Sequence, residues 1–379
     1  MLVMNKICYI VTIPITVRAF FIQQLRFLSL NGFDVSVICS DDGLIGDELG
    51  GTIKYIPLNM PRGISLLGSI RSIRQLVSIF KREQFDLIQY STPNAAFYSS
   101  IAAKIVGCKR RNYHLMGLRY LGAKGLGRIV LKRLEKISCD FSTSIECVSS
   151  SNLEMCISEG LFKSKKACVV WNGSTGGVDL NRFNYESRSL WRSGIRADLG
   201  FDETDFVFGF VGRITRDKGI NDLLNAFFAL SGNSKLLLVG PTDELGTLDK
   251  ELLYRSKTDS RIVFHAAVND IERYYAAIDV LVLPSYREGF GNVVIEAGAV
   301  GTPAIVSRIP GPVDAIEEGV TAFTVEPANV VDLQMKMEEI METDYKHTGK
   351  KAYEFVKMHF DSDELCKRIL ERKRFLMVD

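Results

Sequence analysis

Short apolar runs alternate with amphipathic stretches along the whole chain. The runs have the length of strands, and the stretches between them repeat apolar residues every three or four positions, as helices do. This alternation predicts parallel sheets covered by helices on both faces. Strands are predicted at residues 6–12, 33–39, 52–57, 86–90, 111–115, 141–148 and 167–171, and again at 205–211, 235–240, 261–265, 279–284 and 303–307.

Two helical stretches in the first half have a clear apolar stripe. Residues 17–30 carry one stripe and end at Asn31-Gly32, a common helix stop. Residues 64–82 carry another, with arginines beside it. In the second half, helices are predicted at residues 219–230, 270–277, 292–300, 330–341 and 345–375.

A glycine-rich cluster at residues 172–177 reads as a linker between two domains. The chain has 379 residues, and a single hydrophobic core stops growing at about 250 to 300. We therefore predict an α/β protein with two doubly wound, Rossmann-like domains, residues 1–180 and 181–379, facing each other across a cleft. Whether the last helices cross back to the first domain stays open. A ligand is expected at the carboxyl ends of the strands.

Charge divides the chain in the same place. Residues 1–180 carry 22 Lys and Arg against 13 Asp and Glu, a net charge of +9, whereas the remainder has a net charge of −7. Residues 104–136 hold ten of these cations and only one acid, Glu135. An anionic membrane surface and an ordinary solvated face are both consistent with this basic half. Nucleic acid is disfavoured, because no aromatic-rich or finger-like motif accompanies the charge.

Several protein classes are excluded by what the loops lack. No stretch reaches the roughly 18 apolar residues of a membrane span, and none of the eight cysteines forms a CxxC pair, which favours a cytoplasmic protein with reduced thiols. Residues 12–18, after the first strand, lack the glycines of a dinucleotide fingerprint, and no P-loop string is present. Asp361-Ser362-Asp363 reads as a helix cap. No His/Cys cluster has metal-ligand spacing, so we expect neither metal nor cofactor.

Two motifs in the second half carry candidate chemistry. Residues 208–219 read as a buried strand, then Gly212-Arg213, then Lys218-Gly219 opening a helix. Arg213 and Lys218 would leave the carboxyl edge of the sheet beside a helix N-terminus, where cations and backbone N–H groups converge on an anion such as a diphosphate.

The second motif spans residues 281–297 and contains Glu288 and Glu296. Gly289 and Gly291 permit a tight turn before the next helix. The two carboxylates would lie about 8 to 12 Å apart along that helix, a spacing that matches the sugar and the ribose of a nucleotide sugar. Because Glu296 sits among apolar residues, its carboxylate needs a partner, and ligand hydroxyls would serve.

These motifs, in this order, resemble the family 4 retaining glycosyltransferases of the GT-B fold. The subgroup that builds bacterial capsules, O-antigens and other surface polysaccharides is the most similar. The likeness extends to residues 172–183, which resemble the family's interdomain segment, and to residues 113–117, which match the place of its cleft histidine, here His114. The family's glycine pair after the first strand is replaced here by residues 14–18.

The resemblance implies a role for each matching residue on the donor side. Arg213 and Lys218 would neutralise the donor diphosphate and its leaving group, and Glu296 would hold the ribose hydroxyls. Glu288 would hold the donor sugar, and His114 would reach towards that sugar from the first domain. By the same resemblance, the backbone that follows Glu288 would complete the donor site through Phe290, Gly291, Asn292 and Val293.

On the acceptor side, Arg18 and Arg119 are assigned to the lipid-linked substrate. The resulting hypothesis is transfer of a sugar from a nucleotide diphosphate to a polyprenyl-diphosphate-linked glycan. UDP is the expected nucleotide. The reaction would take place at the inner face of the cell membrane, with the basic N-terminal domain against the lipid. Two alternatives stay open: a nucleotide-sugar epimerase of the same fold, and a non-catalytic nucleotide-sugar-binding protein.

Overall fold

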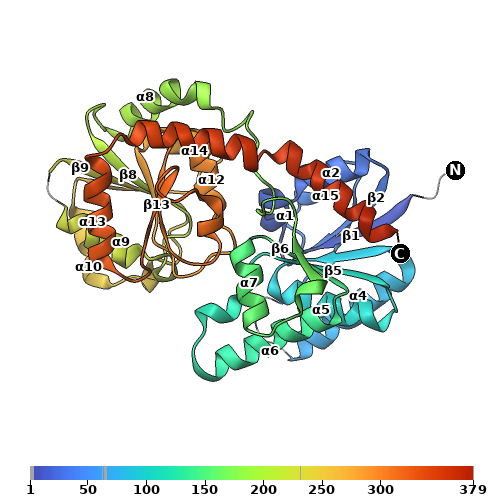
Figure 1. Cartoon of the computed structure of the whole chain (residues 1–379). Helices are drawn as coiled ribbons and strands as arrows, with labels where there is room; N and C mark the ends of the chain where they lie inside the picture. Colours follow the sequence, from blue (N-terminus) through green and yellow to red (C-terminus); the bar gives the residue numbers. More distant parts are fainter. Residues whose placement is uncertain (1–3, 62, 64–65, 231, 379) are drawn as a thin grey trace. The chain divides into compact units, whose positions relative to one another are not determined.

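The computed structural model describes residues 4–61, 63, 66–230 and 232–378, and the chain forms two compact units (Figure 1). The first unit contains Met1–Gly176 together with Asp363–Asp379, and the second contains Gly177–Ser362. The sequence predicts the division at residue 180, with the path of the last helices open. In the structure, the final stretch of the chain belongs to the first unit.

A parallel sheet of seven strands forms the centre of the first unit, in the order β3-β2-β1-β4-β5-β6-β7. Its strands are β1 (Asn5–Ile10), β2 (Phe33–Cys39), β3 (Lys54–Pro57), β4 (Leu87–Tyr90), β5 (Arg110–Leu115), β6 (Ser144–Cys147) and β7 (Ala167–Val169). Ile7 lies opposite Leu87 and Ile10 opposite Tyr90, so β1 and β4 end at the same edge. The chain reverses its winding direction between these two strands, which is where ligands bind in open α/β sheets.

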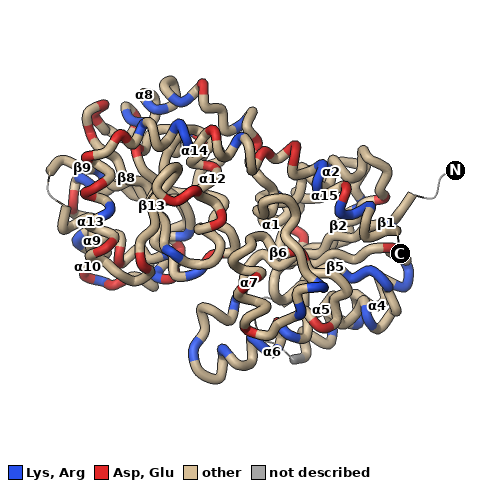
Figure 2. The backbone as a smooth tube through the Cα atoms, in the orientation of Figure 1, with Lys and Arg blue, Asp and Glu red and all other residues tan. Residues whose placement is uncertain are grey.

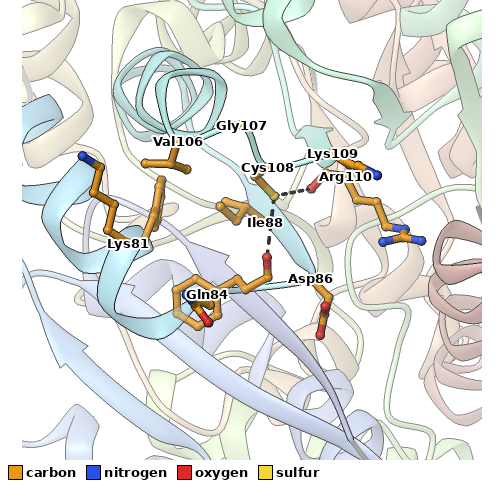
Figure 3. A pocket seen from close by; sticks show the side chains of 11 residues that line it. Lys81, Gln84, Asp86, Ile88, Val106, Gly107, Cys108, Lys109 and Arg110 are labelled. Atoms are coloured by element: carbon orange, nitrogen blue, oxygen red, sulfur yellow. Dashed lines mark hydrogen bonds between the residues drawn. The ribbon is translucent and has the colours of Figure 1, made fainter.

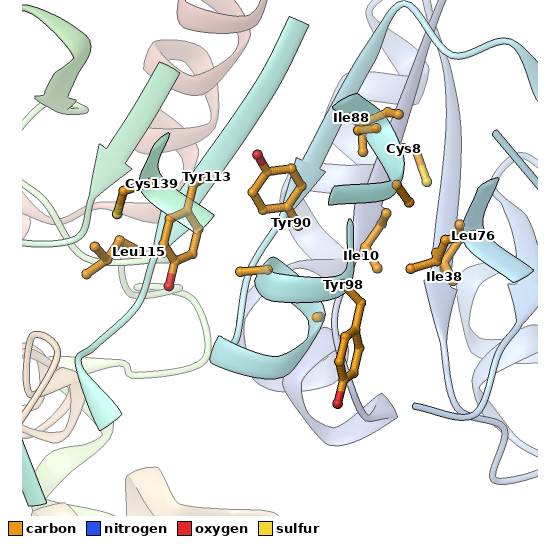
Figure 4. Close-up of a cluster of buried hydrophobic side chains, with 14 of the residues drawn as sticks. Cys8, Ile10, Ile38, Leu76, Ile88, Tyr90, Tyr98, Tyr113, Leu115 and Cys139 are labelled. Atoms are coloured by element: carbon orange, nitrogen blue, oxygen red, sulfur yellow. The ribbon is translucent and has the colours of Figure 1, made fainter. Parts of the chain in front are cut away.

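Helices cover both faces of this sheet (Figure 1). One face packs against α1 (Pro14–Phe20), α2 (Ile22–Leu30), α3 (Ile45–Leu49) and α15 (Ser362–Met377). The other packs against α4 (Leu66–Glu83), α5 (Pro93–Ile105), α6 (Gly125–Phe141) and α7 (Ser150–Ser158). The short 3₁₀ turns η1 (Arg119–Gly122) and η2 (Ser164–Lys166) complete the unit. Figure 4 shows part of the second core, in which Ile38 and Ile10 of the strands lie near Leu76 of α4 and Ile88 lies beside Cys8.

The C-terminal helix α15 is held to the first sheet by apolar packing and by charge. Leu365, Ile369 and Leu370 are buried in the same core as α1 and α2. The Lys373 ammonium, also buried, donates a hydrogen bond of 2.6 Å to the Glu146 carboxylate on β6. A buried charge needs such a partner, so this pair ties the last helix to strand β6.

The second unit is also built on a parallel sheet, ordered β10-β9-β8-β11-β12-β13. The strands are β8 (Phe206–Val211), β9 (Ser234–Val239), β10 (Ile262–His265), β11 (Val280–Leu283), β12 (Ala304–Ser307) and β13 (Ala322–Val325). The helices are α8 (Arg188–Leu199), α9 (Ile220–Ala229), α10 (Lys250–Thr258), α11 (Ile271–Ala277), α12 (Asn292–Ala299), α13 (Val330–Met341) and α14 (Tyr345–His359), with 3₁₀ turns η3 (Tyr185–Ser187), η4 (Arg216–Lys218), η5 (Leu245–Thr247) and η6 (Pro312–Ala315). The prediction of two wound parallel sheets is confirmed.

Two predicted elements differ from the structure, and one strand was not predicted. The helix expected at residues 17–30 begins earlier, at Pro14, and divides at Phe21, whose φ of −121° is not helical. Phe141, assigned to a strand, is the last residue of α6. The strand that was not predicted is β13 (Ala322–Val325). Of the helix expected at residues 64–82, residues 64 and 65 lie outside the described residues.

The basic residues of the first unit follow two of its helices. Figure 2 shows Lys and Arg along α4 and α6, whereas both signs of charge are mixed over the second unit. Across residues 4–61, 63, 66–230 and 232–378, no helix is both long enough and apolar enough to cross a membrane.

Candidate active site

The predicted donor motifs meet at the carboxyl edge of the second sheet. Phe208 lies opposite Val280 and Gly209 opposite Leu281, so β8 and β11 end at the same level. The order of the sheet reverses between these two strands, which is the usual ligand position of such sheets. The loop carrying Arg213 and the loop carrying Glu288 therefore leave the sheet side by side.

Lys218 and Glu288 form an ion pair at this edge. The Lys218 Nζ donates to Glu288 Oε1 at 2.6 Å, and their side chains are only 20% and 13% exposed. A charge-assisted hydrogen bond of this length in a partly buried position is a strong one. The sequence predicts separate roles for these residues, Lys218 at the phosphate and Glu288 at the sugar. In the structure their side chains contact each other.

Gly219 allows the two loops to approach each other. It has a φ of 73°, caps α9, and an added Cβ would lie 2.0 Å from the Pro284 carbonyl oxygen. The backbone N–H of Tyr286 donates to the Asp217 carbonyl at 3.1 Å and fastens the loops again. A side chain at residue 219 would push Lys218 and Glu288 apart.

This contact predicts a large effect of Gly219→Ala. We expect the free energy of unfolding to fall by about 3 kcal/mol or more, because the left-handed strain of about 1 to 2 kcal/mol is joined by a clash with backbone. Gly200→Ala is the matched control: its φ is 69°, with no heavy atom within 4 Å of the added Cβ, so it pays only the strain. Urea denaturation of both variants measures the difference, and equal losses would contradict the role of the close approach.

Asp217 organises the cations around this pair, and the sequence analysis missed it. Its carboxylate lies 2.9 Å from Arg287 and 3.6 Å from Arg213, and it accepts a hydrogen bond of 2.5 Å from Thr215. Burial opposes ionisation here, but the bond from Thr215 and the nearby cations lower the Asp217 pKa. Its position directly before Lys218 was the available signal. Arg287, beside Glu288, was missed in the same way.

Arg213 is the more exposed of the two predicted phosphate ligands. Its side chain is 47% exposed and reaches Glu244 at 2.9 Å as well as Asp217. Exposed pairs of this kind contribute little to stability, so the guanidinium is available to a stronger anion at small cost.

The N-terminus of α12 offers backbone N–H groups beside Glu288. Gly291, with a φ of 92°, is the N-cap and has no side chain to occupy them. Asn292 and Val293 form the first turn. Phe290 is buried and packs edge-on against Phe360, with ring centroids 5.3 Å apart, which fixes the turn. The positive end of the helix dipole thus lies where the predicted donor binds.

Glu296 has a protein partner in the structure. The Tyr275 hydroxyl, on α11, donates to Glu296 Oε2 at 2.8 Å. Burial raises the Glu296 pKa, although this hydrogen bond opposes the shift. The interdomain segment reaches the same place: the Phe183 ring packs on Tyr275, and Arg182 pairs with Glu272 of α11 at 3.0 Å. Tyr275 was missed, because nothing in its own helix marks it.

In the first unit, His114 lies near the carboxyl end of β5 and is buried. Its ring packs edge-on against Phe21, with centroids 5.7 Å apart, and its Nδ1 is 3.9 Å from Glu146 Oε2, beyond hydrogen-bond distance. Burial lowers the His114 pKa despite this carboxylate. The imidazole is therefore neutral near pH 7, with one nitrogen able to donate and the other to accept.

The two residues assigned to the acceptor already have partners. Arg18 donates to Asp42 at 2.6 Å and to Glu48 at 2.5 Å, which raises its pKa. An acceptor phosphate at Arg18 would compete with both carboxylates. Arg119, at the start of η1, donates to the Asn94 side-chain oxygen at 3.2 Å. Both assignments stay predictions.

The first unit has a hollow at the amino edge of its sheet, opposite to the edge at which wound sheets bind ligands. Figure 3 shows it between the end of α4 and the starts of β4 and β5, with Lys81, Lys109 and Arg110 among its lining residues. The Cys108 thiol lies within it, 3.7 Å from the Phe85 carbonyl. Since ligands of wound sheets bind at the carboxyl edge, we do not place the substrate here. Within the described ranges, no three His, Cys, Asp or Glu side chains are grouped as a metal site.

Two family models match the chain, one in each unit. Residues 6–149 match the model described as glycosyl transferase 4-like, and residues 192–355 match the model described as glycosyl transferases group 1. The second match includes Arg213, Lys218, Glu288 and Glu296.

Curated relatives and solved structures agree with these models. The capsular polysaccharide biosynthesis glycosyltransferase CapM of Staphylococcus aureus is 30% identical, over 87% of this chain and 88% of its own. An α-1,3-galactosyltransferase of Escherichia coli, named for UDP-Gal and GlcNAc-diphosphoundecaprenol, is 28% identical over 85% and 84%. Sucrose-phosphate synthase from Thermosynechococcus elongatus superposes with a TM-score of 0.81 at 21% identity, covering 98% of this chain and 99% of that chain. Anabaena HepE in complex with UDP gives 0.79 at 21%, over 98% and 100%.

Proposed function

Because this chain belongs to the family 4 glycosyltransferases of the GT-B fold and to surface polysaccharide biosynthesis, we propose that it moves a hexose from a UDP-sugar to a diphosphate-linked polyprenyl glycan. The donor is held by the second unit and the acceptor by the first. The epimerase and the non-catalytic alternatives have no support among the relatives named above, which are transferases.

The Lys218–Glu288 ion pair is the observation that carries the donor assignment. In a nucleotide sugar, the diphosphate is bonded to the anomeric carbon of the hexose. A cation for the phosphate and a carboxylate for the sugar hydroxyls must therefore lie within a few ångströms of each other. The distance of 2.6 Å between Nζ and Oε1 satisfies this requirement.

The chemistry needs charge stabilisation on the leaving group. When the bond between the anomeric carbon and the phosphate oxygen breaks, the nucleoside diphosphate keeps the electron pair, and its negative charge grows. Lys218, Arg213 and the N–H groups at the start of α12 are placed to stabilise that charge. Glu296 is assigned to the ribose hydroxyls, and neutral His114 to a hydroxyl of the transferred sugar.

Acceptor chemistry follows from the relatives. The Escherichia coli enzyme is named for a diphosphoundecaprenol-linked sugar, and a Campylobacter jejuni relative for N,N'-diacetylbacillosaminyl-diphospho-undecaprenol. For this chain we assign the same class of acceptor, and we assign Arg18 and Arg119 to its phosphates.

The test is release of UDP from a panel of UDP-sugars, measured with and without polyprenyl-diphosphate-linked glycans. Release that depends on the acceptor, with a lengthened glycolipid seen by mass spectrometry, is the expected result. Conversion of the nucleotide sugar without acceptor would instead identify an epimerase. Tight binding of UDP without turnover on any acceptor would identify a sensor.

The proposal includes association with the inner face of the cell membrane. Leu67 on α4 and Leu126 on α6 are 83% and 82% exposed, and both helices carry arginines and lysines. Apolar side chains beside cations suit the surface of an anionic bilayer.

We expect Leu67→Asp and Leu126→Asp each to weaken binding to anionic vesicles by about tenfold or more, since each removes a leucine whose burial in the bilayer would contribute about 1.5 to 3 kcal/mol. Leu190→Asp, on α8 of the second unit, is the control, because Leu190 is 74% exposed but lies outside the basic half. Flotation of the three variants with vesicles measures the effect. Equal binding by all three would place the membrane contact elsewhere.

A further inference from the structure

A pocket of about 410 Å³ lies between helices α4, α5 and α6 of the first unit. None of the residues that line it is assigned to the donor site. Its volume falls within the range of about 300 to 1,000 Å³ that is usual for sites of small ligands.

The wall of this pocket is mostly apolar. Ile70 and Ile73 contribute from α4, Phe97 from α5, and Leu131 and Leu134 from α6. All five are at least partly exposed, so the pocket is open to a ligand and not filled by the core. Transfer of a hydrocarbon into such a space is favoured by about 25 cal/mol per Å² of apolar surface removed from water.

Polar groups gather at one end of the pocket. Asn94, in the first turn of α5, lies beyond the carboxyl end of β4, and Arg119 lies beyond the carboxyl end of β5. The Arg119 guanidinium and the Asn94 side-chain oxygen are 3.2 Å apart. The polar end thus faces the edge at which a wound sheet binds its ligand, and the apolar wall lies between the helices.

Basic residues stand next to wall-forming residues along the two outer helices. Arg71 and Arg74 lie on α4 and Arg133 on α6, and all three are exposed. Arg119 is the cation that lines the pocket itself, so a ligand with an anionic head and an apolar tail finds complementary charge at Arg119 and complementary surface inside.

We propose that this pocket binds the first isoprene units of the lipid acceptor, with the acceptor diphosphate at Arg119. The inference rests on the proposed function for its acceptor class, and it adds a tail-binding site to it. The pocket would then fix the position of the acceptor diphosphate on the first unit.

Glu135 allows a second test of the pocket, through the pH dependence of ligand binding. Its carboxyl forms part of the wall and accepts a hydrogen bond of 2.5 Å from Tyr113, and burial raises its pKa to about 7. The carboxyl is neutral below that pH and charged above it, so hydrocarbon binding should weaken as the pH rises through neutrality. The ionisable groups facing it are Tyr113 of β5, Arg119 and Tyr120 of η1, Cys139 of α6 and Cys156 of α7.

The probe for the test is farnesyl diphosphate, measured by equilibrium dialysis with the whole chain. Leu131→Trp, which fills the pocket, should weaken its binding by about tenfold or more. Ile105→Trp is the control, since Ile105 is 60% exposed at the far end of α5 and does not line the pocket. Arg119→Gln should weaken binding of farnesyl diphosphate but leave binding of farnesol unchanged. Glu135→Gln should remove the pH dependence of binding.

A change in folding is separated from a filled pocket by urea denaturation and by a second variant. If Leu131→Trp unfolds over the same range of urea concentration as the unchanged protein, its loss of the probe reports the pocket. If it does not, Ile73→Trp fills the same space from α4. Unaltered probe binding in a folded pocket variant overturns the inference. So does equal displacement of the probe by phosphatidate, which would make the occupant a phospholipid chain.

Turnover distinguishes the two proposals. Sugar transfer that proceeds in the folded Leu131→Trp variant with an unchanged KM for a long-chain acceptor leaves the proposed function standing and removes the tail site. Probe binding that is lost in the variant, in a protein that transfers no sugar, leaves the tail site standing and removes the proposed function. The expected result is a KM raised about tenfold for the long-chain acceptor only.

Discussion

Replacing Lys218 by alanine is expected to slow sugar transfer by about 10²- to 10³-fold, the cost of losing one charge-stabilising group at the leaving phosphate. The ammonium is the partly buried cation of the site, and it is held 2.6 Å from Glu288. Its removal also leaves that carboxylate, 13% exposed, without its cation. The loss should fall on kcat more than on KM, because charge on the phosphate grows in the transition state. Steady-state kinetics with the best UDP-sugar measure both.

The Arg216→Ala variant is the control for Lys218. Arg216 belongs to the same turn, η4, but its side chain is exposed and has no place in the proposed site. Glu288→Ala alone should cost a similar factor. The double variant Lys218→Ala with Glu288→Ala should lose little more than either single one, because paired groups act as a unit. Losses that multiply, or full activity in Lys218→Ala, would remove the ion pair from the mechanism.

Breaking the buried pair of Glu146 and Lys373 should have the largest effect on stability. Lys373→Met leaves a buried carboxylate short of its nearest cation, and removal of one partner from a buried pair costs about 3 to 5 kcal/mol. Arg372 lies 3.3 Å from the same carboxylate and offsets part of the loss. Limited proteolysis should then release the C-terminal helix α15 first, and urea denaturation gives the free energy.

Glu371→Gln is the control on the same helix, since Glu371 is 67% exposed and its pair with Arg368 should contribute less than about 1 kcal/mol. The pH dependence has a definite sign. The charged partners of Glu146 lower its pKa despite burial, so its stabilisation is present above about pH 4.5 and is lost as the pH falls further. The difference in free energy of unfolding between the unchanged protein and the double variant Glu146→Gln with Lys373→Met should become smaller as the pH falls over that range. A difference that does not depend on pH would contradict the assignment.

The strands of both units could be predicted from the sequence because their apolar runs are bounded by polar turns. The break at Phe21 could not, since the apolar stripe of residues 17–30 continues through it and no proline or glycine marks it. Phe141 fits the end of a helix and the start of a strand equally well, and packing decides. Local periodicity fixes the kind of element better than its ends.

The candidate donor residues could be picked out of the sequence because they lie at or shortly after marked turns. Arg213, Lys218 and Glu288 each adjoin a glycine, and Glu296 lies within α12, which begins directly after Gly291. Their partners are a different matter: Asp217 meets Arg287, which is 70 positions away, and Tyr275 meets Glu296 from another helix. Such pairs depend on the register of β8 and β11, which no single segment of sequence contains.

The membership of α15 in the first unit has a consequence for biosynthesis. Residues 363–379 leave the ribosome only after the whole of Gly177–Ser362, which takes tens of seconds at about 5 to 20 residues per second. Until then, the sheet face that Leu365, Ile369 and Leu370 cover stays bare, and Glu146 lacks Lys373. We therefore expect the second unit to complete its fold first during translation, with the nascent first half a client for chaperones until the chain is released.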